Sequence, residues 1–242
     1  MERFSRTEKL IGQAKLEILQ ESSVTLVGAG AVGSFAAEAL VRSGIGSITI
    51  VDFDVISLSN INRQLYALES TLGRPKTKVA AERLLDINPS CKVKPLNIQA
   101  VEETIPEILA DEPDILIDAI DTVNPKLELL SYAVNNGIPV ISSMGAARRF
   151  DPTSVKTGDL FKTAHCPLAR LMRKYLRRRG IKSGIMCVYS DETPHGPKKG
   201  EIDNDLTGAN HSTKILGSLP TVTGIFGLML ADAAIKFLIE KT

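Results

Sequence analysis

Charged and amide side chains follow one another closely in the stretch VDFDVISLSNINRQ, which occupies residues 51–64. Asp52 stands where nucleotide-binding α/β folds place an acid that hydrogen-bonds a ribose. A nicotinamide-binding protein has no obvious use for Asn60, Arg63 and Gln64 so soon after that acid. An arginine instead suits a reaction in which negative charge builds up at phosphorus. The stretch therefore predicts chemistry at a nucleotide phosphate.

Two further charged residues are expected to reach the same place. Lys76 follows Pro75, where a helix is predicted to begin, so it lies in the first helical turn and points back toward the sheet edge. Asp121 ends the strand predicted in DILIDAIDTV. Because the carboxyl ends of strands converge in a doubly wound sheet, both residues should meet Arg63 near the phosphates. Each alone is more often a surface charge or a helix-end group, but their joint placement favours a site.

The acids in these stretches could serve a metal ion as well as a ribose. Mg²⁺ prefers a few carboxylates together with phosphate oxygens, so Asp121 could hold it. Asp54 could bind the ribose beside Asp52 or help to hold the cation. The alternative for Asp54 is a turn former or a helix cap.

A glycine-rich turn, GAGAVG at residues 28–33, lies between a predicted strand and a predicted helix. This is the context that the GxGxxG motif requires for nucleotide binding. Gly28 allows the tight turn, Gly30 lets a phosphate approach the backbone next to Ala29, and Gly33 lets the helix pack on the strand. Free amides and the positive end of the helix dipole then face the anion. A tight turn without a ligand is the alternative.

Apolar residues alternate between the spacing of strands and that of helices. Strands are predicted at 24–28, 47–52, 92–98, 114–120, 139–144 and 184–190. Helices are predicted at 8–20 (as one or two short helices), 31–44, 73–88, 103–111, 125–137 and 165–182. Several strands are continuously apolar, which is typical of a parallel sheet covered on both faces. We expect an α/β fold with a doubly wound, mainly parallel, Rossmann-like sheet and a basic C-terminal extension.

The pattern changes near residue 150. Residues 1–150 are expected to form a Rossmann-like nucleotide-binding region, and residues 151–242 a basic segment with a strand and a helix that complete the same domain. Glycine, proline and charge predict a loop at 191–214. Apolar residues at 221–242 predict a helix that is buried or lies against a membrane, a membrane span being the less favoured alternative.

Composition narrows the class of protein. Hydrophobic residues make up 43% of the chain, charged residues 24%, and the net charge is +1, as in an ordinary soluble protein with no general attraction to nucleic acid. The three cysteines are scattered and form no CxxC pair. This excludes a four-cysteine zinc site, so no structural zinc is expected, and it fits a reducing cytoplasm.

A local excess of positive charge follows the nucleotide-binding region. Residues 161–190 contain no acid, and HCPLARLMRKYLRRRGIK can form a helix with one apolar face. Such a surface suits a polyanion, RNA above all, although a solvated helix face is the alternative. The candidate RNA-binding residues are Arg148, Arg149, Arg173, Lys174, Arg177, Arg178 and Arg179. The first two follow a strand end and could instead meet a substrate carboxylate.

The motifs GAGAVG, VDFDVISLSNINRQ, GRPKTKVAAERL and DAIDTV together resemble the adenylyltransferase superfamily of ubiquitin-activating enzymes. This superfamily includes the activators of molybdopterin and thiamine biosynthesis. The resemblance implies ATP and Mg²⁺ as cofactors. It implies that Asp52 binds the ribose, that Asn60, Arg63 and Lys76 bind the phosphates, and that Asp121 coordinates Mg²⁺.

The same resemblance implies a homodimer. An N-terminal arginine of one subunit reaches the ATP phosphates of the other in this superfamily, and Arg6 in RFSRTEKLIG stands at the matching place, with Arg3 as the near alternative. Some members pass a carrier protein on as a thioester. Cys166 and Cys187 are the candidates for such a thiol, but no supporting motif surrounds either, and a small buried side chain is the favoured interpretation.

A subgroup resemblance then covers the whole chain. SSMGAARRFDPTSVKTGDLFKT, CVYSDETP and GSLPTVTGIFGLMLA are similar to the tRNA threonylcarbamoyladenosine dehydratases. This implies an ATP-dependent cyclisation of a modified adenosine in tRNA through an acyl-adenylate. The alternatives are an adenylyltransferase for the C-terminus of a ubiquitin-like sulfur carrier and a nucleotide-binding module without chemistry. A cysteine desulfurase with its sulfur acceptor is a further partner that the resemblance admits.

Overall fold

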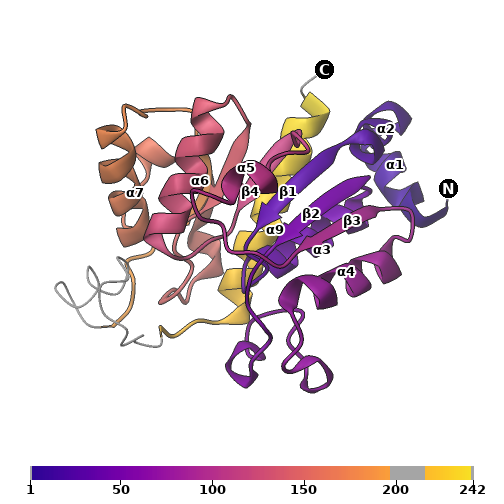
Figure 1. Ribbon diagram of the computed structural model, residues 1–242, viewed down its shortest axis with the longest axis horizontal. Coiled ribbons are helices and arrows are strands. Elements are labelled where there is room, and N and C mark those ends of the chain that lie inside the picture. Colours follow the sequence, from indigo (N-terminus) through magenta and orange to yellow (C-terminus); the bar gives the residue numbers. More distant parts are fainter. Residues whose placement is uncertain (1, 197–215, 241–242) are drawn as a thin grey trace.

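The computed structural model describes residues 2–196 and 216–240, and its centre is a seven-stranded sheet in the order β3-β2-β1-β4-β5-β7-β6 (Figure 1). The strands are β1 (Ser23–Val27), β2 (Ser47–Val51), β3 (Lys92–Leu96), β4 (Ile115–Asp118), β5 (Val140–Ser143), β6 (Val155–Asp159) and β7 (Met186–Ser190). Neighbouring strands are parallel except for the antiparallel pair of β6 and β7. The strand order reverses between β1 and β4, which confirms the doubly wound, mainly parallel fold.

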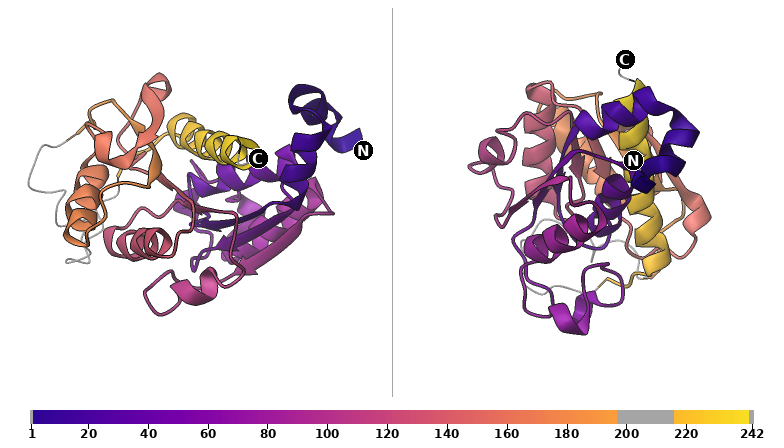
Figure 2. Two further views of the ribbon diagram at one scale, coloured as in Figure 1. Left: turned by 90° about the horizontal axis from the view of Figure 1, so that it is seen from above. Right: turned by 90° about the vertical axis from the view of Figure 1, so that its right-hand side faces the viewer.

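Helices cover both faces of the sheet. They are α1 (Ser5–Ile11), α2 (Gln13–Glu21), α3 (Gly33–Ser43), α4 (Lys76–Ile87), α5 (Ile105–Ile108), α6 (Val123–Asn135), α7 (Pro167–Arg178) and α9 (Pro220–Glu240). Buried residues of α2, α3, α4 and α9 form one core, and those of α5, α6 and α7 form the other. Figure 2 shows the two layers, with α9 on one side of the sheet and α6 on the other.

The strands are apolar throughout because each side of the sheet has a core. In β4, Ile115 and Ile117 belong to the first core and Leu116 to the second. This is the reason that the parallel strands show no alternation of polar and apolar residues. Most of the loop predicted at 191–214 lies outside the described residues.

Helix α9 packs in the first core and lies against α3. By length and composition it could cross a membrane, but 56% of its most apolar window is buried within the protein. Two glycines bring the helices together. A Cβ on Gly227 would lie 2.4 Å from the Val32 carbonyl oxygen, and one on Gly224 would lie 3.3 Å from the Phe35 ring. Helix α9 therefore supports α3 directly behind the glycine-rich turn.

Candidate active site

The glycine-rich turn between β1 and α3 is closely packed. Gly28 has a φ of +99°, and its amide donates to the Val51 carbonyl at 2.8 Å. A Cβ there would lie 2.8 Å from the carbonyl oxygen of Ala119. A Cβ on Gly33 would lie 1.8 Å from the carbonyl oxygen of Gly28, whereas one on Gly30 would meet nothing closer than Gln64 Nε2 at 3.7 Å. The turn thus requires glycine for its own packing at Gly28 and Gly33, but not at Gly30.

This difference predicts opposite results for two alanine substitutions. Gly33→Ala forces the turn and α3 apart, so the free energy of unfolding should fall by about 1–3 kcal/mol and ATP binding should be lost. Gly30→Ala should leave the melting temperature nearly unchanged and still weaken ATP binding by at least about tenfold, because the added methyl occupies the path of the phosphate. Thermal melts and ATP titrations test both. Equal melting temperatures for the two variants would contradict the packing argument.

The first acid of the VDFD stretch is fixed by the turn. Asp52 Oδ2 accepts a hydrogen bond from the Ala29 amide at 2.8 Å, and its Oδ1 accepts one from the Asp54 amide at 2.9 Å. Burial raises the pKa of Asp52, and the nearby Lys76 ammonium opposes that rise. The carboxylate lies at the carboxyl end of β2, where a ribose would be held.

Lys76 begins α4, as its position after Pro75 predicts, and only 5% of it is exposed. Its Nζ lies 2.7 Å from Asp54 Oδ2 and 3.8 Å from Asp52 Oδ1. Asp54 therefore holds the lysine beside Asp52. To bind a phosphate, the Lys76 ammonium would exchange the Asp54 carboxylate for a phosphate oxygen.

The SNINRQ stretch is folded on itself. Arg63 Nη1 donates to the Ser59 carbonyl and to Asn62 Oδ1, each at 2.8 Å. Asn60 Oδ1 accepts from the Ser57 amide at 3.1 Å. Gln64 is buried beside the glycine turn, and its Oε1 has no hydrogen-bond partner among the residues that the structure describes. Arg63 and Asn60 would have to exchange these local partners for a ligand.

The turn after β4 carries a candidate metal ligand. Asp121 is exposed, and it follows Ala119, whose carbonyl lies against Gly28. The backbone thus brings Asp121 close to the glycine turn. The sequence did not reveal the residues beneath it: Asp118 and Lys126 are both fully buried and form an ion pair at 2.6 Å. An acid inside an otherwise apolar strand was the signal that could have found them.

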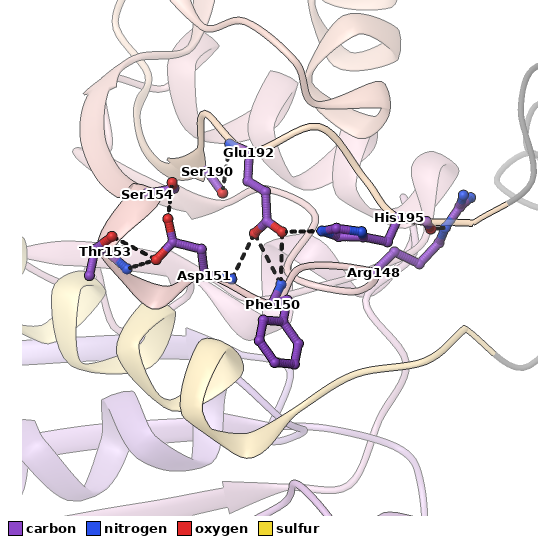
Figure 3. A network of polar contacts seen from close by, with 8 residues as sticks. All are labelled: Arg148, Phe150, Asp151, Thr153, Ser154, Ser190, Glu192 and His195. Carbon is purple, nitrogen blue, oxygen red and sulfur yellow. Dashed lines mark hydrogen bonds and ion pairs between the residues drawn. The ribbon is translucent and has the colours of Figure 1, made fainter.

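A hydrogen-bonded network joins the loop after β5 to the segment after β7 (Figure 3). Glu192 Oε2 accepts from the amides of Phe150 and Asp151, each at 3.0 Å, and Oε1 lies 2.6 Å from His195 Nε2. Partial burial alone would raise the pKa of Glu192, but these hydrogen bonds outweigh it and lower that pKa. Glu192 therefore stays ionised and fixes the loop at the carboxyl edge of the sheet.

Arg148 connects this network to the SNINRQ stretch. It has a φ of +60°, its amide donates to the Gly217 carbonyl at 2.8 Å, and its Nε donates to the His195 carbonyl at 2.5 Å. Next to Gly217, the Ser218 carbonyl accepts from Asn62 Nδ2 at 3.3 Å. Arg148 is thus placed near the turn of Arg63 by the backbone.

The candidate RNA-binding residues on α7 and at its C-terminal end fall into two groups. Lys174, Arg177 and Arg178 are exposed on α7, opposite its buried apolar face. Arg173 and Arg179 instead serve the fold: Arg173 donates to Thr163 and to the Leu160 carbonyl, and Arg179 pairs with Glu128. Only the first group offers cations to a partner without breaking a hydrogen bond or an ion pair within the described residues.

Arg149 does not lie on the surface. It is 3% exposed, and its Nη2 donates to the His165 carbonyl at 3.1 Å. Its Nε and Nη1 have no hydrogen-bond partner in the described part of the chain. A contact with tRNA, one of the two roles expected of Arg149, therefore does not fit its position. The neighbouring loop of His165 covers it.

The cysteines are all buried and free. Burial raises the pKa of Cys187 to about 12, and Cys166 is 3% exposed. Structural thiols that are buried in this way are unreactive. The geometry therefore agrees with the interpretation of both residues as packed side chains.

Comparisons with known proteins give a consistent result. The model of the ThiF family matches residues 4–242. A tRNA threonylcarbamoyladenosine dehydratase of Bacillus subtilis is 40% identical over 243 residues, which is 99% of this chain and 96% of the relative. A crystal structure of the Escherichia coli tRNA N6-threonylcarbamoyladenosine dehydratase in complex with ATP matches with a TM-score of 0.89 and 34% identity, covering 99% of this chain and 95% of that one. The molybdopterin-synthase adenylyltransferase of Escherichia coli is 34% identical, but over only 56% of this chain and 53% of its own.

Proposed function

Because this chain belongs to the ThiF family, we propose that it uses ATP to activate a carboxylate, and that this is the threonine carboxylate of threonylcarbamoyladenosine in tRNA. The observation that carries the proposal is the full-length similarity to a dehydratase solved with ATP. The site geometry supports it, since Asp52 and Lys76 lie together at the carboxyl edge of the sheet. The enzyme is an ATP-dependent dehydratase, and we propose that it acts on tRNA in the cytoplasm.

The reaction has two steps. An oxygen of the threonine carboxylate attacks the α-phosphorus of ATP, the bond to the β-phosphate breaks, and pyrophosphate leaves. The urea group of the same side chain then bonds to the activated carbonyl carbon, the carbonyl–AMP bond breaks, and one urea proton is released. The carboxylate oxygen leaves in AMP, so the nucleoside loses the elements of water. Proximity of the urea to the carbonyl favours ring closure, and no enzyme thiol takes part.

The residues of the site supply binding and charge. Asp52 holds the ribose, and Arg63 and Lys76 neutralise the negative charge that develops on the phosphates. Asn60 and Gln64 complete the phosphate contacts. The reaction consumes no sulfur, so a cysteine desulfurase with its sulfur acceptor would be a binding partner and not a source of substrate.

A magnesium ion fits the donors that this edge presents. Asp121 is an exposed carboxylate beside the glycine turn, whereas Asp54 is occupied by Lys76 at 2.7 Å. One free carboxylate with phosphate oxygens is the kind of ligand set that Mg²⁺ prefers. When bound there by Asp121, the ion would stabilise charge on the phosphates as the new bond forms.

A second copy of the chain would complete the site. Several large apolar side chains are exposed around the phosphate-binding stretch, which is typical of an interface: Phe53, Val55, Leu58, Ile61, Leu68 and Leu72. Arg6 lies on α1, and the following α2 leads into the amino end of β1, whereas the nucleotide residues lie at the carboxyl ends (Figure 1). Within one subunit Arg6 is therefore far from the phosphates, and the homodimer brings in the partner's copy.

Mixing two inactive variants tests this dimer. Arg6→Ala and Arg63→Ala should each abolish activity as homodimers. After subunit exchange, half of the dimers are mixed and each carries one intact site, so activity should recover to about one quarter of the wild-type value. Pyrophosphate release measures the recovery. An inactive mixture, with exchange verified by native mass spectrometry, would contradict the contribution of Arg6 across the interface.

The function itself is tested with purified protein, ATP and tRNA that carries threonylcarbamoyladenosine. AMP and pyrophosphate should be released only with this tRNA, and the nucleoside should lose the mass of water. Unmodified tRNA and a sulfur-carrier protein are the controls. Release that depends on the carrier alone would establish the adenylyltransferase alternative, and ATP binding without release would establish a non-catalytic module.

A further inference from the structure

A buried charged network lies beneath the candidate metal ligand. The ammonium of Lys126, on α6, is 2.6 Å from Asp118 Oδ2 and donates to the Ile120 carbonyl at 2.8 Å. Ser142 of β5 donates to the same Asp118 oxygen at 2.6 Å. Asp118 Oδ1 accepts from the Ile120 amide at 3.1 Å. Both polar groups of the Ile120 backbone are therefore held by this pair.

The network fixes the turn from which Asp121 projects. Ile120 immediately precedes Asp121, and the amide of Ala119 donates to the Val27 carbonyl at 2.8 Å. The carbonyl of Ala119 lies against Gly28 of the nucleotide turn. Any movement of the Ile120 peptide would therefore change the position of Asp121 relative to the glycine turn.

A gain in folding stability does not by itself explain the buried ion pair of Asp118 and Lys126. Removing two charges from water costs several kcal/mol, and an ion pair in the interior is often no more stabilising than apolar residues of the same shape. Asp118 and Lys126 are both 0% exposed, so neither side chain can touch a ligand directly. What the pair does supply is a second layer of hydrogen bonds behind the site, of the kind that orients metal ligands.

We propose that Lys126, paired with Asp118, is a positioning residue for the metal site. Its ammonium holds the Ile120 carbonyl and so places the Asp121 carboxylate where Mg²⁺ and the ATP phosphates meet. This inference rests on the proposed use of ATP with Mg²⁺ at Asp121. It does not depend on which carboxylate is activated.

The test measures how strongly ATP binding depends on Mg²⁺, by calorimetric titration of ATP at a series of Mg²⁺ concentrations. Asp118→Asn with Lys126→Met removes both charges and leaves no uncompensated one. In this double variant the Mg²⁺ concentration for half-maximal enhancement of ATP binding should rise by about tenfold or more. ATP binding without Mg²⁺ should stay within about threefold of wild type, because the ribose and phosphate residues are untouched. Lys126→Arg, made alone, keeps the positive charge and the hydrogen-bond donors. This single variant should retain most of the wild-type Mg²⁺ response.

A control separates positioning from the general loss of an ion pair. Glu38 and Arg83 form a partly buried pair at 2.5 Å between α3 and α4. Glu38→Gln with Arg83→Met should leave the Mg²⁺ response unchanged. If the Asp118–Lys126 double variant does not fold, Ser142→Ala weakens the network without removing a charge and should raise the Mg²⁺ requirement about two- to threefold.

An unchanged Mg²⁺ response in the folded double variant, or in Ser142→Ala, would overturn the proposal. Failure of the proposed function looks different. In that case wild-type protein would release no AMP with the modified tRNA, while its Mg²⁺-dependent binding of ATP and the effect of the Lys126 variants would remain measurable.

Discussion

Arg63→Ala is expected to reduce the release of AMP and pyrophosphate by at least about 10³-fold, the range found when an arginine that stabilises charge in phosphoryl transfer is removed. The guanidinium is half-buried and donates to the Ser59 carbonyl and to Asn62. It can turn to the phosphates at the cost of these two contacts. Because the effect falls on chemistry, affinity for tRNA should stay near that of wild type. Rapid-quench measurement of pyrophosphate and a filter-binding assay separate the two.

The matched control is a second arginine of the same region. Arg74 pairs with Glu82 at 2.6 Å on the surface, and such exposed pairs contribute little. Arg74→Ala should keep nearly full activity. Comparable losses in the two variants would mean that net charge near the nucleotide, and not the position of Arg63, supports the reaction.

Reversing charge at Arg177 and Arg178 should produce the second large effect, on the affinity for tRNA. Both side chains are exposed on α7, where Arg177 lies 5.6 Å from the Phe161 ring centroid and Arg178 lies 5.7 Å from that of Tyr175. Arg177→Glu with Arg178→Glu should weaken tRNA binding by at least about tenfold and reduce the salt dependence of log K by about two units, one for each lost phosphate contact. The turnover number with saturating tRNA should change much less than KM.

Lys15 and Lys92 provide a control with the same change in net charge. Both are exposed, on α2 and at the amino end of β3, at the other end of the sheet from the proposed site. Lys15→Glu with Lys92→Glu should leave the salt dependence of tRNA binding as in wild type. Equal losses of tRNA affinity in the two double variants would mean that α7 acts only through the overall charge of the protein.

The strands that contribute residues to both cores were predicted from the sequence. The runs in β1 and β4 are apolar because helices cover each side of the sheet, and α4 begins at Lys76 as its sequence indicates. Strand β6 was not predicted. Its residues, VKTGD, are mostly polar and only Val155 is buried, because the strand lies at the edge of the sheet and pairs on one side only. Nothing in its local pattern distinguishes such a strand from a loop.

Part of the candidate site was predictable from the motifs together with the topology of the sheet. Asp52 and Lys76 come together because their stretches end at the same edge, which topology alone dictates. The burial of Arg149 and the engagement of Arg179 by Glu128 depend on contacts between distant segments. A run of cations in the sequence does not distinguish an arginine that faces solvent from one that closes a contact inside the fold. The ion pair of Asp118 and Lys126 has the same origin, since it forms only when α6 packs on β4.

The packing of α9 against α3 also constrains the order in which the protein can mature during synthesis. Gly227 of α9 lies within contact of Val32 and Phe35, at the start of the helix that the nucleotide turn opens. Domains generally fold as units while the chain is made, so a domain waits for its last element. Here the ribosome produces the turn early and its supporting helix much later, so a nascent chain that has not reached α9 would carry the whole nucleotide motif without a stable pocket. A half-made protein would then neither bind nor consume ATP, and it would present the apolar face of α3 to chaperones until α9 emerged.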